Sequence, residues 1–109
     1  MSLLTAYVDR PTGYGRVLRD AEGKITRIVE EKDASGAEKK IKEVNAGIYA
    51  VSAKFLFSAL DDLNNQNRQG EYYLPDIVRI AHRDGKTVGD LRVDDPREML
   101  GVNTREELA

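Results

Sequence analysis

The feature that most constrains this fold is the alternation of strand-like and helix-like segments along a short chain. Apolar residues recur at every second position over residues 4–8, and a second strand-like stretch covers residues 44–51. Residues 52–63 and 74–84 instead space their apolar side chains as an amphipathic helix does. Such alternation favours an α/β or α+β fold over an all-α or all-β one.

The two helical segments have end signals that support their assignment. Ser52 suits the N-cap of the first helix, whereas Pro75 suits the first turn and Gly85 the C-cap of the second. We expect Asp76 to interact favourably with the positive end of the second helix dipole. The expected core faces are Leu56, Ala59, Leu60 and Leu63 in the first helix, and Leu74, Ile77, Val78 and Ala81 in the second.

Turn residues predict a β-hairpin in the first third of the chain. The sequence Asp-Ala-Glu-Gly at 20–23 suits a type I turn closed by a left-handed glycine, between strands at 17–19 and 24–29. In the strand at 4–8, Leu4, Ala6 and Val8 are expected on the buried face. Four further segments are predicted as a loop or short helix at 33–42, a polar loop at 64–70, a strand at 87–93 and a helix start at 103–104.

Composition excludes several classes of function. The 109 residues suffice for one small domain, and a net charge of -2 offers no basic surface for nucleic acid or an anionic membrane. The absence of cysteine removes disulfides, thiolate catalysis and cysteine-based zinc sites. No apolar run approaches the ~20 residues that span a bilayer. We therefore expect a cytoplasmic, globular protein without nucleic-acid or membrane partners.

Two glycine- and glutamate-containing segments are candidate binding sites. In the Gly13-Tyr14-Gly15-Arg16 segment, the glycines allow bare backbone N–H groups to face a ligand, although an ordinary turn is the commoner explanation. Glu30 ends an apolar strand, where its carboxylate could accept hydrogen bonds from two neighbouring sugar hydroxyls. The simpler interpretation is a solvated strand end, and that is the interpretation we adopt for Glu31.

Two asparagines are further candidates. Asn45 stands inside a strand, where asparagine is disfavoured, and its amide suits a hydroxyl or amide ligand or, equally, a neighbouring backbone group. Asn103 could offer one oxygen to Mg²⁺ or act as a helix N-cap. Tyr72 and Tyr73 could pack or line a sugar site. His82 has no nucleophile arranged near it in the sequence and is interpreted as a surface residue.

Five segments, taken in order, resemble one family. The chain is similar over nearly its whole length to bacterial N-acetylglucosamine-1-phosphate uridyltransferases, the pyrophosphorylase domains of the bifunctional GlmU enzymes. The segments that carry this resemblance are Pro11-Thr12-Gly13-Tyr14-Gly15-Arg16, Ile28-Val29-Glu30-Glu31-Lys32-Asp33-Ala34, Glu43-Val44-Asn45-Ala46-Gly47-Ile48, Gly70-Glu71-Tyr72-Tyr73-Leu74-Pro75-Asp76 and Gly101-Val102-Asn103-Thr104-Arg105.

The resemblance implies a role for each matching residue. Gly15 would contact the sugar through its backbone, Glu30 would bind sugar hydroxyls, and Asn45 would hold the sugar through its amide. Asn103 would share Mg²⁺ with an aspartate, and Tyr72 and Tyr73 would lie near the sugar pocket. The substrates implied are UTP and N-acetylglucosamine-1-phosphate, and no residue here is expected to be catalytic.

The chain also departs from the family pattern. The family's glycine-rich loop and lysine for the triphosphate, the Gly-Asp that supplies the metal's aspartate, and the left-handed β-helix have no counterpart in it. We therefore expect residues 1–109 to form the sugar-binding C-terminal half of a nucleotidyltransferase domain, truncated and inactive alone. Its fold would be a partial Rossmann-like mixed sheet with flanking helices and a β-hairpin.

Two alternatives stay open at this stage. A related enzyme could use glucose-1-phosphate with UTP or dTTP, so the sugar and the nucleotide are not decided by these motifs. The chain could also be a non-catalytic interaction module, since sheet edges exposed by truncation would invite homo-oligomerisation.

Overall fold

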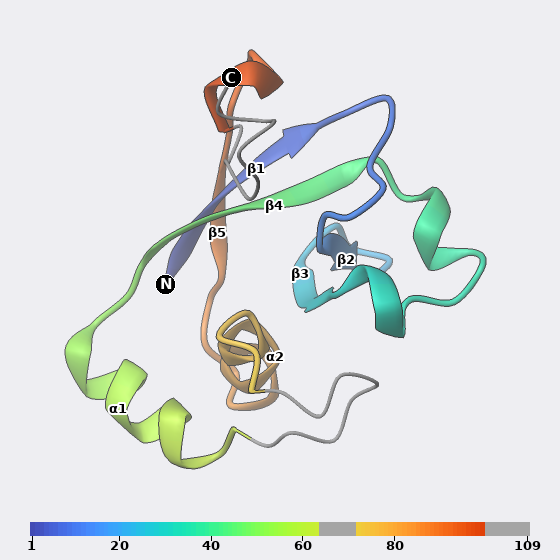
Figure 1. The fold of residues 1–109 in the computed structure, drawn as a ribbon. Helices are drawn as coiled ribbons and strands as arrows, with labels where there is room; N and C mark the ends of the chain where they lie inside the picture. The colour runs from blue at the N-terminus through green and yellow to red at the C-terminus, as the bar shows by residue number, and fades with distance from the viewer. Residues whose placement is uncertain (64–71, 100–109) are drawn as a thin grey trace.

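A computed structural model describes residues 1–63 and 72–99 of the chain. In this part of the chain, a five-stranded mixed sheet has the order β3-β2-β4-β1-β5 and is accompanied by two α-helices (Figure 1). The strands are β1 (Ser2–Tyr7), β2 (Arg16–Arg19), β3 (Ile25–Val29), β4 (Glu43–Ala50) and β5 (Gly89–Arg92). The helices are α1 (Ala53–Asp61) and α2 (Asp76–Arg83), with 3₁₀ turns η1 (Glu31–Asp33), η2 (Glu38–Lys40) and η3 (Pro96–Met99). The predicted α/β class with a mixed sheet is confirmed.

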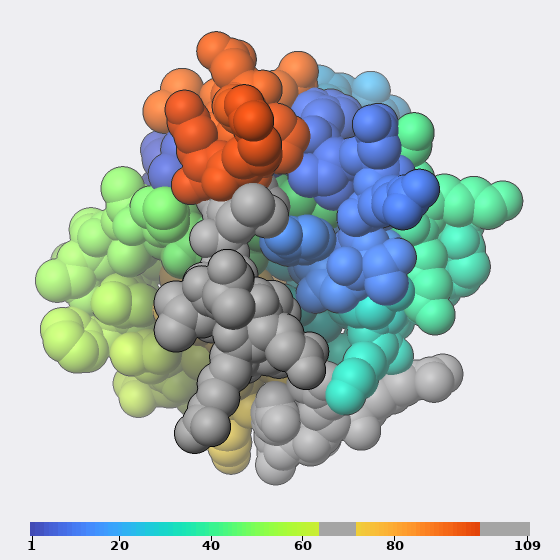
Figure 2. All heavy atoms as spheres, turned by 45° about the horizontal axis from the view of Figure 1, so that its top comes forward, coloured from blue at the N-terminus to red at the C-terminus, as the bar shows by residue number. Residues whose placement is uncertain are grey.

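The sheet combines antiparallel pairs with one parallel pair. β2 pairs with both β3 and β4 in antiparallel orientation, β4 pairs with β1 in the same way, and β5 runs parallel to β1. The two strands of the parallel pair are far apart in the chain, since β2, β3, β4, α1 and α2 lie between them. Just beyond β5, the N–H of Val93 donates to the carbonyl of Thr5 at 2.7 Å. The space-filling view shows η3 beside the N-terminal part of the chain (Figure 2).

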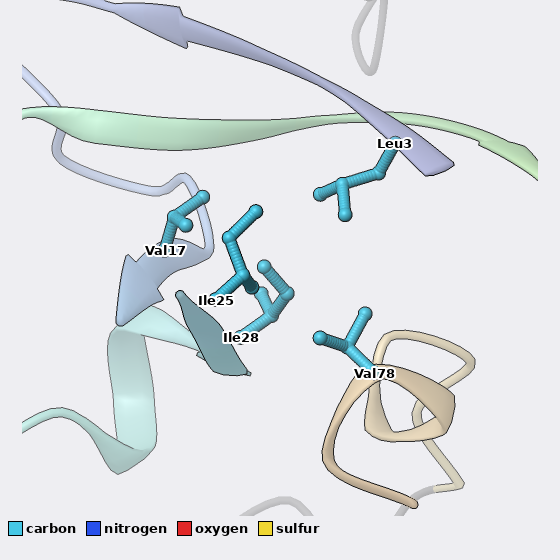
Figure 3. Packing of buried hydrophobic residues seen from close by; sticks show 5 residues of the cluster. All are labelled: Leu3, Val17, Ile25, Ile28 and Val78. Carbon is cyan, nitrogen blue, oxygen red and sulfur yellow. The ribbon is translucent and has the colours of Figure 1, made fainter. Parts of the chain in front are cut away.

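Two clusters of buried side chains form the core. In the first, side chains from β1, β2 and β3 meet Val78 of α2 (Figure 3); the cluster comprises Leu3, Val17, Ile25, Ile28 and Val78. The second joins the two helices and comprises Phe55, Ala59, Ile77, Ile80 and Ala81. Helix α2 therefore lies against both the hairpin and α1, because its apolar residues cover more than one side of the helix.

The predicted core faces of the helices are partly wrong. Helix α1 packs through Phe55 and Ala59, whereas Leu60 is 40% exposed. Its sequence is apolar over so wide an arc that spacing alone did not decide which part meets α2. Leu74 is 46% exposed, since it precedes α2 and does not belong to the buried face.

The predicted alternation of β1 is also partly wrong. Leu3, Thr5 and Ala6 are buried, whereas Leu4 and Val8 are only half-buried. β1 lies inside the sheet between β4 and β5, where both faces can be covered, so a simple inward-outward alternation does not apply.

The end signals of the hairpin and the helices are confirmed. Gly23 has a φ of +85° and closes the turn between β2 and β3, and the Asp20 carboxylate accepts the N–H groups of residues 22 and 24. The Ser52 hydroxyl accepts the N–H of Phe55 at 3.2 Å, as an N-cap does. Gly85 follows α2 with a φ of +73°, the left-handed conformation expected after a helix.

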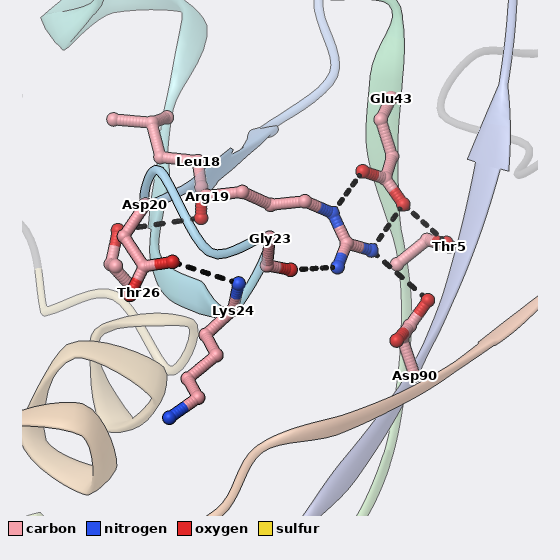
Figure 4. Close-up of polar contacts among 9 residues, drawn as sticks. All are labelled: Thr5, Leu18, Arg19, Asp20, Gly23, Lys24, Thr26, Glu43 and Asp90. Carbon is pink, nitrogen blue, oxygen red and sulfur yellow. Dashed lines mark hydrogen bonds and ion pairs between the residues drawn. The ribbon is translucent and has the colours of Figure 1, made fainter.

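A polar network around the buried residues Thr5 and Glu43 links four strands (Figure 4). The Arg19 guanidinium donates to both Glu43 oxygens at 2.8 and 2.9 Å, to Asp90 at 3.0 Å and to the Gly23 carbonyl. Thr5 donates its hydroxyl to Glu43 at 3.0 Å, which explains how a polar residue can be fully buried in β1. Burial acts to raise the pKa of Glu43, but the hydrogen bonds from Arg19 and Thr5 outweigh it, so the net shift is downward.

Candidate functional site

The end of the β2–β3 hairpin brings Gly15 and Glu30 together. Arg16 pairs with Val29 across the hairpin, so the residues flanking that pair, Gly15 and Glu30, are neighbours. A Cβ atom added to Gly15 would lie 3.2 and 3.3 Å from the two Glu30 oxygens and 3.0 Å from a methyl carbon of Ile28. Glycine therefore allows the backbone to approach the carboxylate more closely than any other residue would.

The third predicted residue, Asn45, joins this pair from β4. Arg16 also pairs with Val44, and the backbone N–H of Asn45 donates to the Gly15 carbonyl at 2.9 Å. These three residues are separated by 15 positions from one to the next in the sequence. The sheet order nevertheless places the strands beside them, β3, β2 and β4, next to one another. The structure thus brings together three of the predicted site residues.

A β-bulge shapes β4 immediately after Asn45. Thr5 pairs with Asn45 and Leu3 with Tyr49, so three residues of β4 lie opposite one residue of β1. Within the bulge Gly47 has a φ of +80°, a conformation that residues with side chains rarely adopt. Bulges often redirect a side chain beside a functional site.

The side chain of Asn45 is held at both ends. Its carbonyl oxygen accepts the N–H of Gly47 at 2.9 Å, and its amide nitrogen donates to the Tyr49 hydroxyl at 2.8 Å. Local bonding of this kind was one of the two interpretations of Asn45. These two contacts leave one amide proton and one oxygen lone pair of Asn45 available. Asn45 can therefore bond its neighbours and still bind a ligand.

Negative groups surround Glu30. Burial raises the pKa of the Glu30 carboxyl, and the nearby charges of Asp76 and Asp33 raise it further. Burial also raises the pKa of Asp76, at the start of α2, although Arg79 and Arg27 oppose this shift. Within residues 1–63 and 72–99, no hydrogen bond or ion pair engages the Glu30 side chain, so its oxygens can accept hydrogen bonds from a ligand's hydroxyls.

The interpretation of Glu31 as a solvated strand end is wrong. Glu31 forms an ion pair with Arg16, whose side chain is almost completely buried. Arg16 also donates to the carbonyls of Tyr14 and Lys39. A charged group inside a protein needs such partners, and here they tie the Gly13–Gly15 turn to the segment after Glu30.

The remaining predicted residues are less closely tied to this cluster. Tyr72 is 67% exposed, and Tyr73 is half-buried with its carbonyl accepting the N–H of Asp76 at 3.1 Å. Asn103 lies outside the described residues, so its metal role remains a prediction. His82 is exposed, as expected.

Residues 1–63 and 72–99 contain no group of three or more histidine, aspartate or glutamate side chains placed to hold a metal ion. They also contain no helix long and apolar enough to cross a membrane.

Sequence reasoning missed Tyr49. Its ring packs against the first core cluster, while its hydroxyl contacts Asn45 and lies close enough to Glu30 for that charge to act on it. The available signal was Gly47, because a glycine inside a strand commonly marks a bulge, and a bulge changes which side chains can meet.

Two cavities of about 290 and 390 Å³ lie away from this cluster. The smaller is lined by the β2–β3 turn and the end of α2, including Lys24 and His82, and the larger by residues around Phe55 and Thr87. The cluster of Gly15, Glu30 and Asn45 is therefore defined by its polar groups and not by either cavity.

Comparison with known proteins points to one group of relatives. No protein-family model matches the chain. The chain is 50% identical over 109 residues to the bifunctional protein GlmU of Geotalea daltonii and 53% identical over 108 residues to that of Pelotomaculum thermopropionicum, covering 24% of each. It is 49% identical to the GlmU of Desulfotalea psychrophila, of which it covers 32%. The chain thus spans about a quarter to a third of the length of these curated relatives.

Proposed function

Because this chain is related along its whole length to one part of the bifunctional GlmU proteins, we propose that it carries the sugar-binding part of a nucleotidyltransferase. The proposed substrates of the whole enzyme are UTP and N-acetylglucosamine-1-phosphate, and the products are UDP-N-acetylglucosamine and pyrophosphate. The observation that supports this proposal most is the meeting of Gly15, Glu30 and Asn45 at the edge of three adjacent strands.

The chemistry of these groups suits a sugar ring. The Glu30 carboxylate has acceptor positions for two hydroxyl groups on neighbouring carbons, and a carboxylate acceptor strengthens each hydrogen bond. The remaining donor and acceptor of Asn45 can pair with a hydroxyl or an acetamido group. Gly15, without a side chain, lets the ligand approach the backbone between them.

In the proposed reaction, these residues position one substrate. An oxygen of the sugar phosphate attacks the α-phosphorus of UTP, a P–O bond forms, and the bond to the leaving pyrophosphate breaks. Such a transfer depends on alignment and charge neutralisation rather than on a protein nucleophile. Mg²⁺ with Asn103 as one ligand remains part of the proposal, and it would neutralise phosphate charge; residues 1–63 and 72–99 provide no cluster of acidic or histidine ligands for it.

We expect the 109-residue chain to bind the sugar phosphate without turning over UTP. Isothermal titration with N-acetylglucosamine-1-phosphate measures the first expectation, and an assay for released pyrophosphate measures the second. Undetectable binding by the folded chain would contradict the sugar site, and turnover would contradict the predicted inactivity.

Two experiments distinguish this proposal from the alternatives that the sequence leaves open. Titration with glucose-1-phosphate shows whether the acetamido group matters: tighter binding of glucose-1-phosphate would indicate the related enzyme class. Light scattering tests the interaction module, because a stable oligomer without sugar affinity would favour that interpretation. Exposed Leu91 on edge strand β5 and Ile48 on β4 are the apolar residues to substitute in that case.

A further inference from the structure

Tyr49 combines a fixed aromatic ring with a hydroxyl group that faces the candidate site. The ring packs against the cluster containing Leu3, Ile28 and Val78, which restricts its movement. The hydroxyl accepts the amide N–H of Asn45 at 2.8 Å. A side chain anchored in the core at one end can hold its polar end in one place at small entropic cost.

The bulge in β4 makes this contact possible. In a regular strand, residues 45 and 49 would lie about 13 Å apart along the chain, too far for their side chains to meet end to end. The left-handed conformation of Gly47 shortens this path, and its N–H fixes the Asn45 carbonyl oxygen at the same time. The two contacts together define the orientation of the amide plane.

We propose that Tyr49 is a positioning residue, which orients the Asn45 amide so that its free proton and lone pair face the sugar beside Glu30. This inference rests on the proposed function, since it assigns Tyr49 a part in sugar recognition. Without the hydroxyl, only the Gly47 N–H would hold the amide, so the amide plane could tilt about that single contact. A misdirected amide pairs poorly with a fixed hydroxyl.

The protonation state of Tyr49 agrees with this role. Burial raises the pKa of the phenol to about 12; the hydrogen bond from Asn45 opposes this shift, and the charge of Glu30 adds a smaller upward contribution. The hydroxyl therefore keeps its proton at neutral pH. It accepts from Asn45 through a lone pair, and its own proton remains available as a donor.

The test is a double-mutant cycle with Tyr49→Phe and Asn45→Ala, measured by titration with N-acetylglucosamine-1-phosphate. Tyr49→Phe keeps the ring and removes only the hydroxyl, so we expect the affinity to fall about fivefold. If Tyr49 acts through Asn45, adding Tyr49→Phe to Asn45→Ala causes no further loss. Additive losses in the cycle, or unchanged affinity of Tyr49→Phe, would overturn the inference.

Two further measurements keep the result interpretable. Tyr7→Phe is the matched control: Tyr7 is a half-exposed tyrosine whose ring stacks on Arg92, and its variant should bind as the unmodified chain does. The NMR signals of the Asn45 side-chain amide should shift in Tyr49→Phe, and unshifted signals would also overturn the inference. Absence of binding by the unmodified chain would contradict the proposed function instead, and the amide signals would then decide the role of Tyr49 alone.

Discussion

At the scale of single residues, the candidate site depends on close approach. Gly15 and Glu30 come within a distance that leaves no room for a side chain at position 15. The Glu30 carboxylate is also partly buried, and the charges of Asp76 and Asp33 act on it. Two substitutions separate the steric requirement from the electrostatic one.

Gly15→Ala should weaken sugar binding and destabilise the fold. The new methyl group would lie 3.0 Å from Ile28 and 3.2 Å from a Glu30 oxygen, so the hairpin end must shift. Overpacking of this kind costs about 1–3 kcal/mol. Urea denaturation and titration measure the two effects. Gly36→Ala is the control, because its added carbon would meet nothing within 4 Å, and equal effects of both substitutions would contradict the steric argument.

Glu30→Gln should weaken sugar binding about tenfold or more, because a charged acceptor is lost, and should stabilise the fold at neutral pH. The pKa of Glu30 is raised by burial, then by Asp76 and Asp33, so the folded state binds its proton more readily than the unfolded state does. This carboxyl's contribution to stability therefore decreases as the pH rises from its ordinary value of 4.5 through the raised folded value.

Unfolding free energies of the two forms across this pH range measure the effect. We expect equal stability well below pH 4.5 and a more stable variant at neutral pH. A variant less stable than the unmodified chain at neutral pH would show that the carboxylate stabilises the fold, contrary to this prediction. A stabilised variant that binds the sugar more weakly would be an instance of the stability cost that binding sites commonly carry.

At the scale of elements, strand β4 carries the most specific feature of the site. Its bulge turns Asn45 and Tyr49 toward each other, and it depends on the left-handed backbone of Gly47. A regular strand with the same residues would separate these side chains. The bulge is thus an element-level requirement for the site.

Gly47→Ala tests this requirement. At a φ of +80° a residue with a side chain costs about 1–2 kcal/mol, so stability should fall by that amount. Gly85→Ala is the matched control. Gly85 has a φ of +73°, an added carbon there would have no atom within 4 Å, and the residue follows the C-terminal end of α2. Both variants should lose similar stability, but only Gly47→Ala should lose sugar affinity. An equal loss of affinity in Gly85→Ala would refute the assignment.

At the scale of the whole molecule, the network of Arg19, Glu43, Thr5 and Asp90 joins β2, β4, β1 and β5. Glu43 is 4% exposed and receives hydrogen bonds from two of these residues. Arg19 and Asp90 are exposed, so the buried acceptor Glu43 is the member whose hydrogen bonds matter most to the fold. The network therefore stabilises the order of the strands that carry the site.

Glu43→Gln should destabilise the chain by about 1–3 kcal/mol at neutral pH, because the hydrogen bonds from Arg19 and Thr5 lose a charged acceptor. The pKa of Glu43 is lowered overall, because the hydrogen bonds from Arg19 and Thr5 outweigh burial. Its stabilisation is therefore complete above its ordinary value of 4.5 and is lost as the pH falls through the lowered folded value. Thermal unfolding against pH should show this loss in the unmodified chain and a smaller one in the variant. Glu22→Gln, in an exposed pair with Lys24, should change little, and a comparable effect there would argue against a special role for Glu43.

Within residues 1–63 and 72–99, the sequence by itself determined which strands and α-helices form, with bounds at most two residues from the observed ones. The hairpin turn at residues 20–23, the Ser52 cap and the glycine after α2 are confirmed, because each depends on contacts within a few residues. It also identified Gly15, Glu30 and Asn45 as candidates, and the structure places these three together although their roles in binding stay predictions.

Only the tertiary structure decided which side chains are buried and which polar groups meet. Thr5 is buried because Glu43, 38 residues away, accepts its hydroxyl, and Glu31 is not a solvated strand end because it pairs with Arg16. Tyr49 reaches Asn45 only through the bulge. Local propensities act over a few neighbouring residues, whereas these contacts depend on strand order and register, which bring distant parts of the chain together.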